Sequence, residues 1–142
     1  MTGKSRSEPP PFTHQLRVRF GECDPQGIVF NANYLAYVDV ALTELWRTAF
    51  GSYQAMVDRG IDTVVHEVNL LYRASARFDD VLTIAGGFEP PGRTSAVLRL
   101  TFRRGDEDLV EARMRYVFVD TPGLRKTEIP DWVRDGLAPF VL

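Results

Sequence analysis

The segment NYLAYVDVALTELWRTAF, residues 33–50, decides the fold. It predicts a long helix, which Asn31 or Asn33 caps at its start and Gly51 ends. Its few polar positions leave most of the helix circumference apolar, and such a helix is covered by other structure. We therefore expect the rest of the chain to wrap around this helix.

Five segments outside the helix alternate apolar and polar residues, as half-buried strands do. Their apolar faces are formed by Leu16, Val18 and Phe20; by Val64, Val68, Leu70 and Tyr72; by Leu82, Ile84 and Phe88; by Ala96, Leu98, Leu100 and Phe102; and by Val110, Ala112, Met114, Tyr116 and Phe118. This one-sided pattern predicts an antiparallel sheet, in which the turn at 104–108 joins the last two strands. Short helices are expected at about 52–59 and 131–137. Curling the sheet around the long helix gives an α+β architecture.

Length and composition place the chain among ordinary globular proteins. Its 142 residues make about one domain, and 44% hydrophobic with 25% charged residues argues against global disorder. Residues 1–12 are rich in proline and predict a flexible tail with nothing buried, followed by the domain at 13–142.

Charge and residue usage exclude several classes of function. A net charge of −2 gives no overall basic field for nucleic acid. The single cysteine, Cys23, and the absence of zinc-ligand spacing argue against a metal site. The strongly apolar stretch at 34–41 is too short for a membrane span. We expect a cytoplasmic protein with no membrane partner.

The connection FGECDPQGIVFNANY, residues 20–34, is the candidate for chemistry. It leads into a helix N-terminus, whose unpaired N–H groups can polarise a carbonyl oxygen. If the loop folds back, the carboxylate of Asp24 and the helix start at Asn31 face one cleft, an arrangement suited to acyl transfer or hydrolysis. Spacing alone favours the alternative that Asp24 only forms a turn before Pro25.

The chain resembles the hotdog-fold thioesterases of the 4-hydroxybenzoyl-CoA thioesterase family, in the branch whose catalytic Asp lies in the first loop. The matching positions are Asp24, Pro25, Gly27, Ile28, Val29, Asn33 and Tyr34, followed by Asp79, Asp80, Leu82 and Ile84. The resemblance covers about residues 13–120. It implies a single hotdog domain, with a five-stranded antiparallel sheet around one long central helix, in agreement with the patterns above.

The resemblance also implies an enzyme that hydrolyses an acyl-CoA thioester, and we expect no cofactor. In that branch the loop carboxylate, here Asp24, attacks the thioester carbonyl or activates water. N–H groups at the helix start, here near Asn31, polarise the carbonyl oxygen. The positions that would meet substrate are Gly27, Ile28, Val29, Phe30, Asn31 and Tyr34. Sites of the family lie between subunits, which implies a homodimer or homotetramer.

Two positions depart from the family pattern. Asn31 stands where relatives often carry His or Tyr, so only a backbone role transfers to it. The turn EPPGRTS after Phe88 has one basic residue, Arg93, where relatives near the benzoyl branch carry several that meet the CoA phosphates. Arg93 either grips a phosphate or is a plain turn residue.

Other interpretations stay open. The acyl group could be carried by an acyl carrier protein, and the chain could also bind acyl-CoA without catalysis or be a purely structural dimer. Another hotdog branch places its catalytic carboxylate on the helix, so Glu44 rivals Asp24. Cys23 has no histidine nearby in sequence and fits a small buried or turn residue better than a nucleophile. His66 is interpreted as a core or interface residue.

Overall fold

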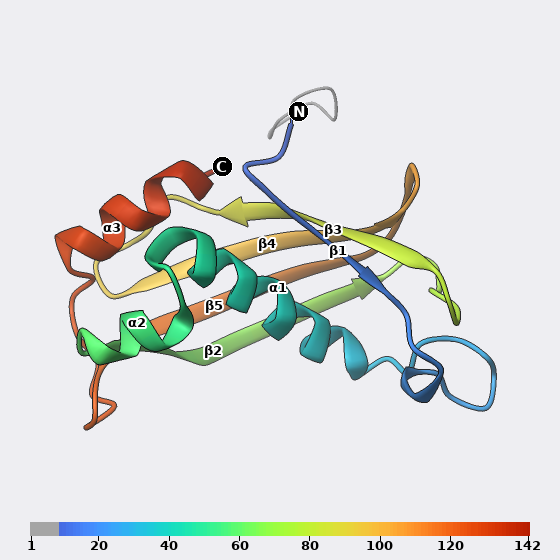
Figure 1. Ribbon diagram of the computed structural model, residues 1–142, viewed down its shortest axis with the longest axis horizontal. Coiled ribbons are helices and arrows are strands. Elements are labelled where there is room, and N and C mark those ends of the chain that lie inside the picture. The colour runs from blue at the N-terminus through green and yellow to red at the C-terminus, as the bar shows by residue number, and fades with distance from the viewer. Residues whose placement is uncertain (1–8) are drawn as a thin grey trace.

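The computed structural model describes residues 9–142, so residues 1–8 of the expected tail lie outside it. One antiparallel sheet has the strand order β1-β3-β4-β5-β2, and a long helix crosses one of its faces (Figure 1). The elements are β1 (Phe12–Arg17), the 3-10 turn η1 (Phe20–Glu22), α1 (Asn33–Phe50), α2 (Tyr53–Asp58), β2 (Ile61–Tyr72), β3 (Val81–Phe88), β4 (Ser95–Arg104), β5 (Glu107–Asp120), α3 (Asp131–Leu137) and the 3-10 turn η2 (Ala138–Phe140). The predicted hotdog architecture is confirmed.

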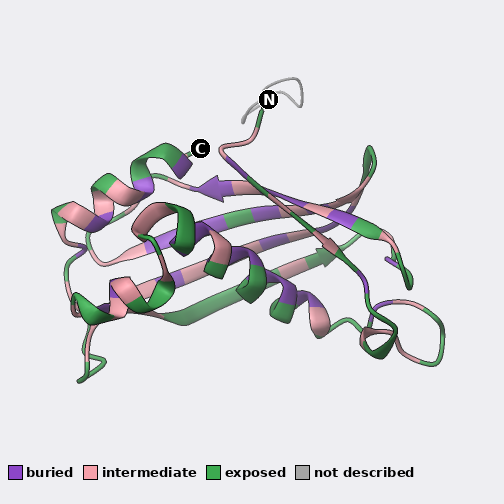
Figure 2. Cartoon of the chain, in the orientation of Figure 1, coloured by how far each residue is buried: buried purple, intermediate pink, exposed green. Residues whose placement is uncertain are grey.

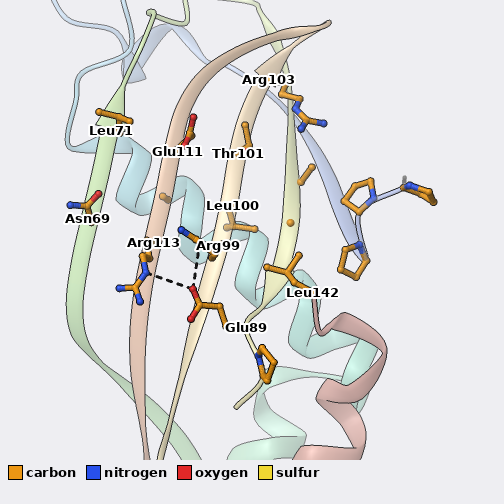
Figure 3. Close-up of a pocket in the computed structure, with 17 residues that line it drawn as sticks. Asn69, Leu71, Glu89, Arg99, Leu100, Thr101, Arg103, Glu111, Arg113 and Leu142 are labelled. Carbon is orange, nitrogen blue, oxygen red and sulfur yellow. Dashed lines mark ion pairs between the residues drawn. The ribbon is translucent and has the colours of Figure 1, made fainter. Parts of the chain in front are cut away.

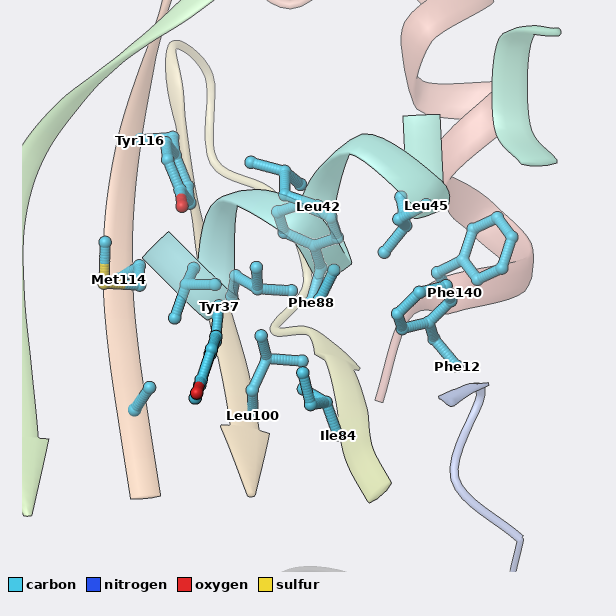
Figure 4. Close-up of a cluster of buried hydrophobic side chains, with 14 of the residues drawn as sticks. Phe12, Tyr37, Leu42, Leu45, Ile84, Phe88, Leu100, Met114, Tyr116 and Phe140 are labelled. Carbon is cyan, nitrogen blue, oxygen red and sulfur yellow. The ribbon is translucent and has the colours of Figure 1, made fainter. Parts of the chain in front are cut away.

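The core lies between α1 and the inner face of the sheet. Leu42 and Leu45 of α1 belong to the same buried cluster as strand residues such as Ile84, Phe88 and Leu100 (Figure 4). The opposite side of the helix stays uncovered, as the green segments of α1 in Figure 2 show, and it carries the exposed apolar residues Leu35 and Val40. Within one chain the expected wrapping is therefore one-sided.

The two ends of the sheet differ. Helices α2 and α3 lie at one end, and the loop between β1 and α1 lies at the other, where β2 ends and β3 begins (Figure 1). The β3–β4 turn belongs to the end with α3, since the Arg134 guanidinium donates to the Gly92 carbonyl at 2.7 Å. The amide of Ile129 also donates to the Arg93 carbonyl at 2.9 Å.

Strand β1 corrects two expectations. It ends at Arg17, and Phe20 is 78% exposed, with its ring against Phe78 at 5.7 Å between centroids. The η1 turn reverses the chain there, so the alternating pattern stops short of Phe20. Phe12 is buried and packs edge-to-face on Phe140 at 6.2 Å, so the expectation that nothing in residues 1–12 is buried is wrong at this position.

Strand β2 is a twelve-residue edge strand with an irregular register. A bulge between Val65 and Glu67 places Val65 opposite the buried Tyr116 and leaves Val64 opposite Val117. Because cross-strand partners point to the same face, Val65 rather than Val64 joins the inner row of Val68, Leu70 and Tyr72. His66 lies at the bulge and is exposed, so it is not a core histidine in this chain.

Candidate active site

The loop that carries Asp24 is a small hairpin. The Asp24 amide donates to the Ile28 carbonyl at 2.9 Å, and the Gly27 amide donates to the Asp24 carbonyl at 2.9 Å. Gly27 has φ of 80°, a left-handed conformation that glycine adopts at little cost. Asp24 Oδ1 accepts from the Gln26 amide at 2.8 Å. Asp24 therefore does form a turn, yet its Oδ2 accepts no hydrogen bond from any residue between 9 and 142.

Glu22 ties the two ends of this loop together. Its carbonyl accepts from the Phe30 amide at 2.9 Å and from Asn33 Nδ2 at 2.8 Å. Its carboxylate accepts from the Tyr37 hydroxyl at 2.9 Å and from the Arg19 guanidinium at 2.6 Å. Partial burial raises the pKa of Glu22, but the hydrogen bonds from Arg19 and Tyr37 outweigh burial and hold that pKa below its ordinary value. An ionised Glu22 thus fixes the loop to helix α1.

The start of α1 has no side-chain cap. Its capping residue is Ala32, so the prediction that Asn31 or Asn33 caps the helix is wrong; the Asn33 side chain donates to the loop instead. The Phe30 amide is bonded to Glu22, and the Asn33 amide to the Phe30 carbonyl. Among the described residues, the amides of Asn31 and Ala32 find no acceptor. Two adjacent N–H groups at a helix N-terminus are therefore free for a ligand oxygen.

A cavity of about 470 Å³ joins these features. It is lined by Asp24, Gln26, Ile28, Val29, Asn31, Tyr34, Tyr72, Arg73, Ala74 and Ser75. Five of the predicted site residues are therefore brought together: Asp24, Ile28, Val29, Asn31 and Tyr34. Gly27 shapes the turn beside the cavity without lining it, and Phe30 is half-exposed next to it.

Arg93 lies elsewhere in the chain. It belongs to the β3–β4 turn, and the length of β3, roughly 24 Å for its eight residues, separates that turn from the end with Asp24. Its guanidinium pairs with Glu128 at 2.6 Å, and both side chains are largely exposed. A single chain does not bring Arg93 to the cavity.

The rival residues have other surroundings. Glu44 pairs with Arg47 at 3.2 Å and lies about 16 Å along the helix from its start, outside the cavity. Burial, with Asp24 and Glu22 nearby, raises the pKa of the Cys23 thiol, which opposes a thiolate nucleophile. Between residues 9 and 142, no group of three or more His, Cys, Asp or Glu side chains could hold a metal ion. No helix in that range is long and apolar enough to cross a membrane.

Sequence reasoning missed the part of the cavity lining that comes from β2 and the residues after it. Tyr72, Arg73 and Ser75 come from the end of β2 and the residues after it. The Tyr72 hydroxyl donates to the Asn31 carbonyl at 3.0 Å. The alternating pattern placed Tyr72 correctly on the inner face, but only the tertiary fold brings its hydroxyl to the helix start.

A second hollow, about 650 Å³, lies on the outer face of the sheet (Figure 3). Arg99 and Arg113 face each other there across β4 and β5, and both pair with Glu89, at 3.5 and 3.7 Å. Arg103 beside them pairs with Asp108 at 3.0 Å. This face is polar and rich in arginine.

Comparison with known proteins decides the family. The sequence pattern of the thioesterase-like superfamily matches residues 18–137, most of the chain. The chain belongs to this superfamily. The 4-hydroxybenzoyl-CoA thioesterase of Pseudomonas sp. strain CBS-3 is 35% identical over 135 residues, which cover 83% of this chain and 91% of that protein. The acyl-CoA thioester hydrolase YbgC of Escherichia coli O6:H1 is 30% identical over 120 residues, covering 84% and 90%.

A solved structure agrees with this fold. A hypothetical protein from Aquifex aeolicus superposes with a TM-score of 0.84 at 28% identity, covering 89% of this chain and 99% of that one. The predicted family is confirmed, and with it the prediction that the chain is an enzyme of the thioesterase class.

Proposed function

We propose that the chain hydrolyses acyl-CoA thioesters, with Asp24 as the catalytic carboxylate. One observation carries the proposal: Asp24 and Asn31, whose helix-start amide has no acceptor among the described residues, line the same cavity, in a chain whose curated relatives are acyl-CoA thioesterases. The substrate class comes from those relatives, and the assignment of residues comes from the geometry.

The helix start supplies the stabilisation of negative charge. When the thioester carbonyl is attacked, its oxygen becomes an oxyanion, and preorganised N–H groups lower the energy of that state. We assign this role to the Asn31 amide ahead of the Ala32 amide, because Asn31 lines the cavity. The positive end of the α1 dipole adds to the effect.

The carboxylate acts on the carbonyl carbon by one of two routes. Asp24 either attacks it and releases CoA as a thiolate, leaving an acyl-aspartyl anhydride for water to hydrolyse, or takes a proton from a water molecule that attacks directly. Both routes need Asp24 ionised. Thiolate is a good leaving group, so neither route needs an acid beside the sulfur.

A second copy of the chain completes the site in this proposal. Edge strand β2 leaves one side unpaired and carries the exposed apolar residues Val64, Val65, Val68 and Leu71. Such an edge is a liability unless another strand covers it. Antiparallel pairing of two β2 strands would bring opposite ends of the two sheets together. The partner's Arg93 would then approach the end that carries Asp24, where it can exchange Glu128 for a CoA phosphate.

The test compares Asp24→Asn with Glu44→Gln on a panel of aromatic and aliphatic acyl-CoA substrates. Hydrolysis is followed by thiol release, and folding by thermal melts. We expect Asp24→Asn to stay folded and to lose on the order of a hundredfold or more in kcat, the lower range for a general base. Glu44→Gln should keep near-normal turnover, because Glu44 lies outside the cavity.

Other outcomes would redirect the proposal. A folded Asp24→Asn protein with normal turnover would remove Asp24 from catalysis, and a loss confined to Glu44→Gln would move the role to the helix. Acyl-CoA binding without hydrolysis by the wild-type protein would make the chain a binding protein. Hydrolysis of acyl groups only when an acyl carrier protein bears them would replace the substrate class.

A further inference from the structure

Tyr72 connects the edge strand to the start of helix α1. It is the last residue of β2, and its ring packs edge-to-face on Tyr34, with centroids 5.7 Å apart. Its hydroxyl donates to the carbonyl oxygen of Asn31 at 3.0 Å. The hydrogen bond joins residues 41 positions apart in the sequence, so it is a tertiary contact and not part of a local turn.

The backbone at Asn31 has few other fixed points. Its amide donates to no acceptor in residues 9–142, and no side chain caps the helix. Its carbonyl also accepts from the Tyr34 amide, but at 3.4 Å, near the upper limit for a hydrogen bond. The contact with Tyr72 is therefore the shorter of the two hydrogen bonds that the Asn31 carbonyl accepts.

A restraint on this carbonyl bears on the amide of the same residue. The N–H and C=O groups of Asn31 are separated by only two rotatable backbone bonds, so fixing the carbonyl narrows the directions in which the amide can point. An oxyanion donor is effective when it is already aimed at the site where charge develops, because it then needs no reorganisation during the reaction. A small misalignment lowers turnover without removing any group from the cavity.

We infer that Tyr72 is a positioning residue, whose hydroxyl holds Asn31 so that its amide points into the cavity. The inference rests on the proposed function, because it acts through the oxyanion donor assigned there. Tyr72 itself touches no reacting atom in this scheme. Its ring forms part of the cavity wall, and its hydroxyl fixes the backbone that does the chemistry.

The decisive variant is Tyr72→Phe, which removes the hydroxyl and keeps the ring and the cavity wall. We expect kcat to fall roughly three- to tenfold, the range that corresponds to one net hydrogen bond, with KM unchanged within about twofold. The melting temperature should hardly move, because the side chain is about half-exposed. Hydrogen exchange in the segment 30–35 should become faster.

Tyr53→Phe is the matched control. It removes the hydrogen bond from the Tyr53 hydroxyl to Asp62 at 2.7 Å, near the opposite end of the same strand. It should leave kcat, KM and exchange in the segment 30–35 unchanged. An equal loss of kcat in both variants would mean that kcat depends on strand β2 in general and not on the hydrogen bond from Tyr72 to Asn31. That result would overturn the inference.

Two further results would also overturn it. Unchanged kcat in Tyr72→Phe would show that Asn31 needs no such restraint. A higher KM with unchanged kcat would make Tyr72 a wall for the acyl group only. If the wild-type protein hydrolyses no thioester, the proposed function fails and this role fails with it; if only the Tyr72→Phe result is negative, the proposed function stands.

Discussion

The two ends of helix α1 are built in opposite ways. At its C-terminal end, Gly51 adopts φ of 90° and donates to the Arg47 carbonyl at 2.9 Å, which closes the helix. Trp46 is stacked there between Phe50 and Phe88, with centroids 5.8 and 6.1 Å away, and Phe50 also meets Trp132. This end is apolar and closed.

The N-terminal end is polar and open. No side chain caps it, two amides have no acceptor among the described residues, and a cavity lies in front of them. A hydrogen bond from Tyr37 to the Glu22 carboxylate holds the loop in place, in addition to the packing of Val29 in the core. The C-terminal end of the helix is therefore built for stability, and the N-terminal end has groups available to a ligand.

The substitution Trp46→Ala tests this division between the two ends of the helix with the largest expected loss of stability. The side chain is almost fully buried, and truncating such a residue costs roughly 3–5 kcal/mol of the free energy of unfolding. Denaturant unfolding measures the loss. The fraction that stays folded should keep its kcat, because Trp46 lies at the end of the helix that is remote from Asp24. Leu35→Ala on the exposed side of the same helix should cost less than about 1 kcal/mol. A kcat that falls with Trp46→Ala in the folded fraction would contradict the separation of the two ends.

An intermediate effect is expected at the polar end, from Asp80→Asn. Asp80 Oδ2 accepts from the Arg77 amide and from the Arg104 guanidinium, both at 2.8 Å, beneath the loop. Burial raises the pKa of Asp80, but these partners outweigh it and lower the pKa overall. The substitution should cost roughly 1.5–3 kcal/mol near neutral pH, the range for hydrogen bonds to a charged group.

The sign of the pH dependence follows from that lowered pKa. The carboxylate stabilises the fold fully above its unfolded pKa, and the contribution is lost as pH falls through the folded pKa. The stability gap between wild type and Asp80→Asn should therefore close in acid, which melts at several pH values would show. Asp79→Asn is the control: Asp79 is 63% exposed, pairs with Arg17 at 3.2 Å, and should matter by less than about 0.5 kcal/mol. A gap that stays constant into acid would mean that the charge of Asp80 does not stabilise the fold.

The periodicity of apolar residues was sufficient to predict the C-terminal end of α1 and the sheet. The helix bounds, the Gly51 stop and the strand faces follow from local patterns, because burial imposes periods that the residues display. The errors arose where a single turn or bulge breaks the period. Phe20 follows the alternation but lies in the η1 turn. The bulge at His66 puts Val65, and not Val64, on the inner face of the sheet.

The open end was predictable only in part. Asp24 stands in the family motif, and Asn31 follows it closely in the sequence at the helix start. Tyr72 and Glu22 gave no such signal, because their roles depend on contacts across the fold: a strand end against a helix start, and a loop against the second turn of α1. Asparagine is a good capping residue, yet Asn33 serves the loop instead, which propensity alone does not reveal.

The smallest expected effect is also the sharpest test of the open end. Ala32 has φ of −69°, the value that proline imposes, and its amide has no acceptor in residues 9–142. Proline matches the φ of Ala32, but it disfavours the helical conformation of the residue before it, so a melt and hydrogen exchange in the segment 30–35 must show that Asn31 keeps its place. It removes one of the two free amides and leaves the Asn31 amide in place. With Asn31 as the oxyanion donor, kcat should stay within about threefold of wild type, whereas loss of the true donor lowers kcat roughly a hundredfold or more. A collapse of kcat in a folded Ala32→Pro protein, with hydrogen exchange in the segment 30–35 as in wild type, would transfer the oxyanion to Ala32 and remove the reason for Tyr72 to hold its neighbour.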